Sequence, residues 1–299
     1  MALGDVDPVT AGDASDLYVL DNGMLDTPRY AAVYLVDSER PAVIETGTGA
    51  NTDVILDALA DLGIGRGDLE VIAPTHAHLD HAGGAGHLAA ACPNAEVHVY
   101  ERAARHLVEP ERVWAGTKAA VGDWVEYYAE PLPVPKDRLV ELGDGDPIDL
   151  GDRALTVHHA PGHAPHQAVF EDPASDCVFT ADAAGLYVDG FAAPRPTTPP
   201  ANFDLEKSLA DIAMMQSLDP AGLCFSHATA APADGLLEAS ARALRAFVEA
   251  VEAAREEVGE DVEAIVDELD PWPDAVAAWG EQRVRETLEL NVRGVLAGA

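Results

Sequence analysis

Four potential metal ligands lie within six residues in the stretch THAHLDHAGG, residues 75–84, of this 299-residue chain. Alternation along an extended segment places His76 and His78 on one side, and Asp80 and His81 follow as the chain bends. The pattern predicts two pairs of ligands that point at two neighbouring places, which suits two metal ions better than one. Imidazole and carboxylate favour zinc, iron, manganese or cobalt, and the absence of a nearby cysteine argues against a sulfur-rich structural site.

Three later segments strengthen this interpretation, because together with the first they resemble the metallo-β-lactamase superfamily. The H-x-H-x-D-H arrangement is similar to the signature of that family, and HHAPGHAPHQ, FTADAAG and FSHAT follow in the family's order. Four ordered motifs between about Tyr30 and His227 argue against a polar turn with incidental histidines. The resemblance implies one metal on His76, His78 and His163, a second metal on Asp80, His81 and His227, and Asp182 as the bridging ligand.

The resemblance also implies a glyoxalase II-like metallo-hydrolase with two divalent metal ions, for which we expect zinc, with iron or manganese as alternatives. A hydroxide that bridges the metals would attack an ester, thioester or lactone, since coordination lowers the pKa of water to about 7. Asp182 and Asp80 are the expected catalytic carboxylates, and Asp80 would help the leaving group depart. The acidic C-terminal tail lacks an obvious counterpart of the basic residues found in members that cleave acyl-glutathione, which argues against glutathione as the thiol.

Two other functions fit the same residues. A sulfur (persulfide) dioxygenase would hold a single iron on two histidines and one carboxylate, here His76, His163 and Asp182. Iron content and oxygen consumption with a persulfide would separate it from the hydrolase. A non-catalytic metal-binding or scaffold role is the third possibility, and the complete ligand sets argue against it.

Four residues outside the ligand sets are candidates for support or substrate binding. Glu45 stands where the family usually has Asp, and we expect it to support the metal site by reaching further, although it could be a solvated strand end. His166 is a candidate for the support of the ligands or the pocket rim. Residues 183–202 form a loop rich in Gly and Pro, of a length typical of binding elements. In it, Tyr187 could donate to an oxyanion or only pack, and Arg195 could hold a substrate carboxylate or be solvated.

Strands and helices that alternate along the chain must position these residues. Strands are predicted at residues 17–20, 31–36 and 41–45, and apolar residues at helical spacing predict a helix over 52–63 with Thr52 as its cap. Hydrophobicity alone predicts an alternating α/β protein. The resemblance implies a four-layer αββα sandwich of two mixed β-sheets with outer helices.

The chain divides into two predicted parts. Residues 1–233 form the expected catalytic domain, with an insertion at about 101–140 whose aromatic residues could line the pocket or belong to the core. Residues 234–299 form a helical extension that could complete the outer layer, cover the site or make a homodimer surface.

The charge is strongly negative, with 53 acidic against 18 basic residues and a net charge of -35. Such self-repulsion is typical of halophiles and predicts a salt-adapted cytoplasmic protein, with an ordinary acidic protein as the alternative. Acidity argues against binding to nucleic acid or an anionic membrane, so a small-molecule substrate is expected. The first ten residues lack a signal-peptide pattern, no run reaches the length of a membrane span, and the three cysteines suggest no disulfide framework.

Overall fold

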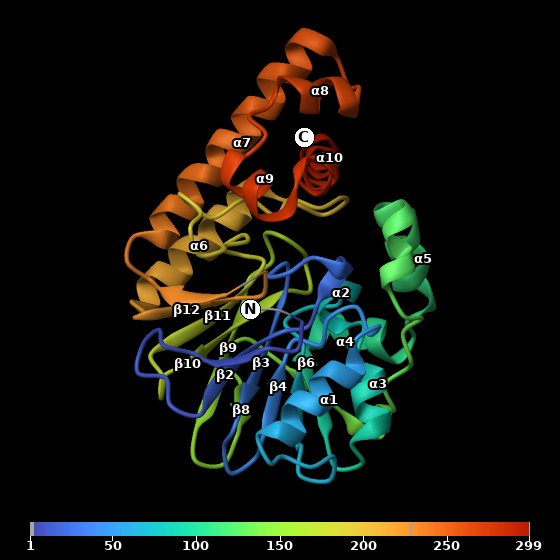
Figure 1. Cartoon of the computed structure of the whole chain (residues 1–299), viewed down its shortest axis with the longest axis vertical. Coiled ribbons are helices and arrows are strands. Elements are labelled where there is room, and N and C mark those ends of the chain that lie inside the picture. Colours follow the sequence, from blue (N-terminus) through green and yellow to red (C-terminus); the bar gives the residue numbers. More distant parts are fainter. Residues whose placement is uncertain (1–2, 228, 299) are drawn as a thin grey trace.

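Two β-sheets face each other at the centre of the computed structural model, which describes residues 3–227 and 229–298 (Figure 1). The first sheet contains, in spatial order, β1 (Val6–Pro8), β2 (Leu17–Asp21), β3 (Ala32–Val36), β4 (Ala42–Ile44), β5 (Val71–Ala73), β6 (Glu96–Tyr100) and β7 (Leu139–Leu142). The second contains β13 (Ala230–Pro232), β12 (Gly222–Phe225), β11 (Cys177–Ala181), β10 (Ala168–Asp172), β9 (Ala154–His159) and β8 (Pro147–Asp149). Both sheets combine parallel and antiparallel pairs, so both are mixed.

Helices cover the outer face of each sheet (Figure 1). The first half of the chain supplies α1 (Thr52–Asp61), α2 (Leu79–Ala82), α3 (Ala85–Ala91) and α4 (Glu101–Val108). Two further elements, α5 (Glu111–Val121) and the 3₁₀ helix η2 (Gly122–Tyr127), follow and contribute no buried residue. The second half supplies α6 (Leu205–Leu218), α7 (Leu236–Val258), α8 (Val262–Glu268), α9 (Pro273–Trp279) and α10 (Glu281–Gly298).

Alternation along the strands builds the layers. On β3, Val33 and Leu35 pack with α1 and α3, whereas Tyr34 and Val36 face the second sheet. The strands are therefore buried on both faces, which explains their nearly continuous apolar sequences. The predicted four-layer αββα sandwich of two mixed sheets is confirmed.

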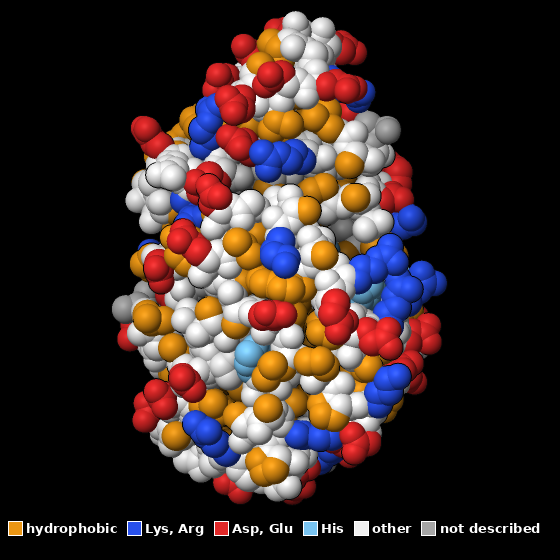
Figure 2. Space-filling view, turned by 90° about the vertical axis from the view of Figure 1, so that its right-hand side faces the viewer, with side chains coloured by type: hydrophobic (Ala, Val, Ile, Leu, Met, Phe, Trp, Pro, Cys, Tyr) orange, Lys and Arg blue, Asp and Glu red, His pale blue; other side chains and the backbone are white. Residues whose placement is uncertain are grey.

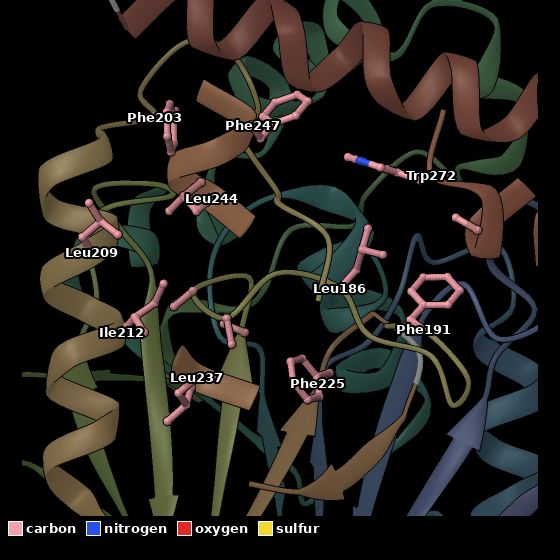
Figure 3. Close-up of a cluster of buried hydrophobic side chains, with 14 of the residues drawn as sticks. Leu186, Phe191, Phe203, Leu209, Ile212, Phe225, Leu237, Leu244, Phe247 and Trp272 are labelled. Carbon is pink, nitrogen blue, oxygen red and sulfur yellow. The ribbon is translucent and has the colours of Figure 1, made fainter. Parts of the chain in front are cut away.

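The C-terminal helices share a core with the second sheet. Phe225 of β12, Ile212 of α6, Leu244 of α7 and Trp272 before α9 belong to one buried cluster (Figure 3). The expectation that the tail completes the outer layer thus agrees with the structure. The division into residues 1–233 and 234–299 stays a prediction.

Several details differ from the sequence-based expectations. Strand β13 follows the segment FSHAT and was not predicted, and Ala228 of that segment lies outside the described residues. Helix α1 is preceded by Asn51 and not capped by Thr52, whose hydroxyl donates to the Gly49 carbonyl (2.8 Å). Gly280, whose φ is +84°, ends α9 and separates it from α10. Within the described ranges, no helix has the length and apolar character needed to cross a membrane.

Candidate metal centre

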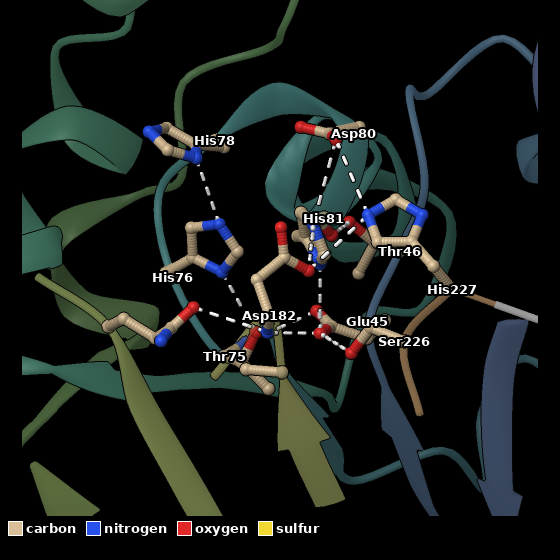
Figure 4. Close-up of polar contacts among 12 residues, drawn as sticks. Glu45, Thr46, Thr75, His76, His78, Asp80, His81, Asp182, Ser226 and His227 are labelled. Carbon is tan, nitrogen blue, oxygen red and sulfur yellow. Dashed lines mark hydrogen bonds and ion pairs between the residues drawn. The ribbon is translucent and has the colours of Figure 1, made fainter. Parts of the chain in front are cut away.

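The predicted ligands meet at one edge of the sandwich, where the strands that carry them end (Figure 4). His163 comes from the turn after β9, Asp182 directly follows β11, and His227 lies two residues beyond β12. The H-x-H-x-D-H stretch follows β5, and its Asp80 and His81 lie within the short helix α2.

Hydrogen bonds fix the end of α2 against the neighbouring loop. The backbone N–H and the hydroxyl of Thr46 both donate to the His81 carbonyl, each at 2.7 Å. The N–H of Gly84 donates in turn to the Thr46 hydroxyl at 3.1 Å. A Cβ atom at residue 84 would overlap the Thr46 carbonyl oxygen, so this close approach requires glycine.

The first ligand group consists of three histidines. His78 Nδ1 lies 3.0 Å from His76 Nε2 and 3.1 Å from His163 Nε2. Nitrogen ligands about 2.1 Å from a tetrahedral ion lie about 3.4 Å apart, so these separations are close to those of atoms that share one cation. A proton on His78 Nδ1 could serve only one of the two other nitrogens, whereas a cation would satisfy all three.

The second ligand group contains Asp80, His81 and His227. The Nε2 atoms of His81 and His227 lie 3.6 and 3.9 Å from Asp80 Oδ2. Each donor atom lies within 4.8 Å of the other two, as in the first group. The residues thus form two adjacent sets of ligands.

Asp182 lies between the two sets. Its Oδ2 is 3.3 Å from His163 Nε2 in the first set. Its Oδ1 is 3.4 Å from His81 Nε2 and 3.3 Å from His227 Nε2 in the second. One carboxylate oxygen therefore faces each set, which is the arrangement that a bridging ligand requires.

The second nitrogen of four imidazoles is held by the protein. The Nδ1–H groups of His163 and His227 donate to the carbonyls of Thr197 (3.2 Å) and Tyr30 (3.0 Å), which can only accept. His76 and His81 are held in the same way by Thr75 (3.0 Å) and Glu45 (3.0 Å). Each Nε2 lone pair is thereby directed at the centre, as in metal sites whose outer partners fix the tautomer.

Glu45 lies where the sequence interpretation expected its support. Its carboxylate accepts hydrogen bonds from the Thr75 hydroxyl (2.6 Å), the Ser226 hydroxyl (2.7 Å) and His81 Nδ1 (3.0 Å). It is only 2% exposed, so the alternative of a solvated strand end does not hold. The φ of Glu45 is +66°, and that of Ala181, just before Asp182, is +48°. Left-handed backbone at a non-glycine residue costs roughly 1–2 kcal/mol, and such strain clusters at functional sites.

The charges differ between the two sets of ligands. Burial and the neighbouring His163 lower the pKa of His78 to about 3, and burial also lowers the pKa of His76 and His163. These imidazoles are neutral at pH 7, as metal ligands must be. Burial alone would lower the pKa of His81, but Asp182 and Glu45 raise it to about 10. The acidic side of the centre therefore favours a positive charge, which a bound cation would supply.

Two buried atoms at the centre test whether the site fits a metal. His81 Nε2 and Asp182 Oδ1 are inaccessible to solvent and have no hydrogen-bond partner among the described residues. An unpaired buried polar atom is costly, so these atoms call for a ligand that the protein does not supply. The residues present fit two divalent cations.

A cavity of about 530 Å³ opens over the metal centre. His78, Asp80, His163, Asp182 and His227 form its floor. Most of the wall is apolar and comes from α5, η2, the 197–202 segment and α10; it includes Val113, Ala120, Val121, Trp124, Tyr128, Pro199 and Leu290. Among the residues that the structure describes, no Lys or Arg lines this cavity. The site therefore offers a charged floor beneath a wall suited to an apolar group.

The remaining candidate residues have different positions. His166 lines the cavity, and its Nδ1 accepts from the Ala77 N–H (3.3 Å). Tyr187 is not among the lining residues, because its ring packs on Phe225 at 5.4 Å between centroids. Arg195 also lies away from the lining.

Arg195 has a packing role in place of the expected substrate contact. Its guanidinium pairs with Asp274 of α9 and lies over the rings of Phe191 (5.7 Å) and Trp272 (5.8 Å). It thus ties the 183–202 loop to the C-terminal helices. Arg195 is therefore neither positioned to bind a substrate carboxylate nor solvated, as the two sequence-based alternatives had it.

Sequence reasoning missed part of the site. Tyr30 and Thr197 contribute backbone carbonyls, for which no side-chain pattern gives a signal. Thr287, Leu290 and Asn291 of α10 complete the cavity wall, so the tail covers the site as well as the sheet. Their apolar and small polar types resemble any buried helix face.

Comparisons with known proteins agree with this geometry. A family model described as the metallo-beta-lactamase superfamily matches residues 26–227. The metallo-beta-lactamase fold-containing protein ST1585 of Sulfurisphaera tokodaii is 27% identical over 217 residues, which cover 71% of this chain and 77% of that protein. The human acyl-coenzyme A thioesterase MBLAC2 is 30% identical over 173 residues, which cover 51% of this chain and 57% of that protein.

Solved structures show the same fold. The crystal structure of the archaeal superfamily protein ST1585 from Sulfolobus tokodaii has a TM-score of 0.69 at 23% identity, covering 95% of this chain and 99% of that one. The family protein TTHA1429 from Thermus thermophilus has a TM-score of 0.60 at 22% identity, covering 89% and 87%. At these identities the likeness concerns the fold alone.

Proposed function

Because this chain belongs to the metallo-beta-lactamase superfamily, we propose that it is a binuclear metal-dependent hydrolase of esters, thioesters or lactones. Within these classes, we propose a thioester with an apolar acyl group as the preferred substrate. The observation that carries the proposal is the apolar cavity of about 530 Å³ directly above two adjacent ligand sets.

The relatives support the thioester among these substrates. Human, chicken and bovine proteins named acyl-coenzyme A thioesterase are 29–30% identical to this chain. The matched segment spans 57% of the human protein, so its activity is carried over here only as part of the proposal.

Divalent cations bound at this centre would supply Lewis acidity and lower the pKa of water to about 7. One cation would be held by His76, His78 and His163. The other would be held by Asp80, His81 and His227, and Asp182 would contact both cations. The four hydrogen-bonded imidazoles keep this arrangement fixed while a substrate enters, so little reorganisation is needed.

Asp80 is the residue that we place at the leaving group. Its side chain is 26% exposed and lines the cavity, whereas the Asp182 side chain is 5% exposed. An accessible carboxylate beside the bound acyl group could accept a proton from the attacking water and pass it to the departing thiolate or alkoxide. The apolar wall would hold the acyl group and exclude water from it, which strengthens the electrostatic contacts at the floor.

The single-iron dioxygenase is the alternative, because His76, His163 and Asp182 would also serve one iron. A persulfide does not need a wide apolar wall, which is why we favour the hydrolase. We propose a small molecule and not a nucleic acid as the partner, because the net charge is -35 and acidic side chains are spread over the face shown in Figure 2. A cytoplasmic location, salt adaptation and a homodimer remain proposals.

The test is reconstitution of chelator-treated protein with zinc, manganese or iron, followed by assays on acyl thioesters, esters, lactones and a persulfide. We expect hydrolysis that requires the added metal and is fastest on thioesters with a medium or long acyl chain. Iron-dependent oxygen uptake with the persulfide and no hydrolysis would support the dioxygenase. Metal binding without either reaction would support a non-catalytic role.

A further inference from the structure

A second hollow, of about 980 Å³, adjoins the cavity over the metal centre. It lies between α4, the start of α5 and the segment 136–141, which we call the α4–α5 groove. The two hollows share Val113, His166 and Asn202 in their linings. A ligand could therefore extend from one into the other.

The α4–α5 groove concentrates positive charge in an acidic protein. Arg102, Arg105, Arg112 and Lys136 line it, which is four of the 18 basic residues in the chain. Lys and Arg side chains gather in one group on the face that carries α4 and α5, with acidic side chains around them (Figure 2). A local cluster of this sign attracts anions even when the whole molecule is acidic.

These four bases are available to a ligand. All four are exposed, and none forms an ion pair with a residue that the structure describes. Arg105 Nε donates a long hydrogen bond to His106 Nε2 (3.4 Å), which leaves its other guanidinium N–H groups to a ligand. Other arginines do pair, as Arg40 does with Glu70 at 2.8 Å. Guanidinium groups bind phosphate with two parallel hydrogen bonds, and a lysine adds a point charge.

Acidic residues limit where an anion can lie. Glu101, Glu109 and Glu141 also line the groove, so four bases and three acids give a local formal charge of +1. The bases that meet near His106 are Arg105 and Arg112, and together with burial they lower the pKa of its imidazole. The anion is thus expected at these two arginines.

His166 connects this place to the metal centre. Its ring centroid lies 5.4 Å from that of His106 in the groove and 5.3 Å from that of the ligand His78. A substrate whose reacting bond lies over the metal floor would pass His166 and reach the arginines with its other end. The apolar cavity would hold the acyl group at the same time.

We propose that the α4–α5 groove binds the phosphate groups of the thiol carrier, so that the enzyme selects acyl thioesters of a phosphorylated carrier such as coenzyme A. This inference rests on the proposed thioester hydrolysis. It names the carrier and assigns its recognition to Arg105 and Arg112.

The test compares two substrates with the same acyl chain, one on coenzyme A and one on N-acetylcysteamine, which lacks phosphate. The Arg105→Gln/Arg112→Gln variant should raise KM for the coenzyme A thioester about tenfold, the loss expected for two exposed charge-assisted contacts. KM and kcat for the N-acetylcysteamine thioester should stay within about twofold. The control is Arg242→Gln/Arg245→Gln, which removes two exposed arginines of α7 outside the groove lining.

Calorimetry with free coenzyme A, at low salt, separates the two proposals because it needs no turnover. We expect the Kd to rise about tenfold in the groove variant and not in the control. Equal Kd values in wild type and groove variant, or equal losses on both substrates, would overturn the groove assignment. Absence of all thioester hydrolysis with intact, arginine-dependent coenzyme A binding would instead contradict the proposed reaction and leave the groove assignment standing.

Discussion

The metal centre and the cavity wall above it are built in different ways. The ligands come from short motifs at the ends of strands, and hydrogen bonds to Glu45, Thr75 and two carbonyls fix four of their imidazoles. The wall joins α5 and η2 to α10, as in the bond from Trp124 Nε1 to Glu286, 162 residues away (3.0 Å). In the proposed hydrolase, the centre would determine the reaction and the wall would determine which acyl group reacts.

The largest effect is expected at the bridging carboxylate. Asp182→Asn keeps the size of the side chain but leaves one oxygen to face two ligand sets. We expect the activity to fall by more than about 100-fold, beyond the range seen for outer partners of metal ligands, and the metal content to fall as well. Elemental analysis and steady-state kinetics measure both. Full activity in a correctly folded variant would show that the centre does not determine the reaction.

A smaller loss is expected at the carboxylate that orients His81. Glu45→Gln removes the charge that accepts the His81 Nδ1–H, so metal affinity or activity should fall about 10- to 100-fold. Ser226→Ala removes one hydrogen bond to the same carboxylate and should cost less. Metal titrations of both variants compare their losses of metal affinity. A loss in Ser226→Ala equal to or larger than that in Glu45→Gln would refute the role of Glu45 in orienting His81.

Changes in the wall should alter selectivity and not the reaction itself. Ala120→Leu places a larger side chain in the cavity, whereas Ala115→Leu is a matched control at an exposed residue of α5. If the larger side chain keeps two methylene groups of the acyl chain from being buried, the lost burial free energy is about 0.8 kcal/mol for each. The preference for long over short acyl chains should then fall roughly tenfold. Ratios of kcat/KM along a chain-length series measure this. An equal loss on all chain lengths would place the acyl group elsewhere.

The smallest effect concerns the turn that carries His163. Asp211 of α6 accepts a hydrogen bond from the Gly162 N–H (2.7 Å), and burial raises its pKa from 3.8 to about 7. As the pH rises, the Asp211 carboxyl group therefore loses its proton in the unfolded chain at a lower pH than in the folded protein. The free energy of unfolding should fall between about pH 4 and pH 7 as a result. Asp211→Asn should flatten the dependence in this range, as measured by denaturant unfolding. An unchanged profile would show that Asp211 does not titrate as described.

The ligand sets and the fold could be predicted from the sequence because both depend on short motifs and on alternation within single strands. Four short motifs place His76 to His81, His163, Asp182 and His227 at strand ends, and alternation in the strands buries two faces. By contrast, the sequence suggests Tyr187 and Arg195 only because they lie in the loop that follows Asp182. The loop directs them to Phe225 and Asp274, because partners more than 30 residues away decide those contacts.

The cavity wall and the α4–α5 groove could not be predicted either, because they depend on how separate elements pack. Leu290 and Trp124 meet over the centre only after α10 has packed against the second sheet. Arg105 of α4 and Arg112 of α5 line the same groove because the chain turns between these two helices. No spacing rule relates such pairs before the chain folds.

Metal content and hydrolysis measured on one sample test the central claim most directly. The protein would be purified in high salt, analysed for metals and assayed with acyl thioesters. We predict close to two divalent ions per chain together with thioester hydrolysis. A single iron with persulfide-dependent oxygen uptake, or full hydrolysis without bound metal, would contradict the binuclear hydrolase.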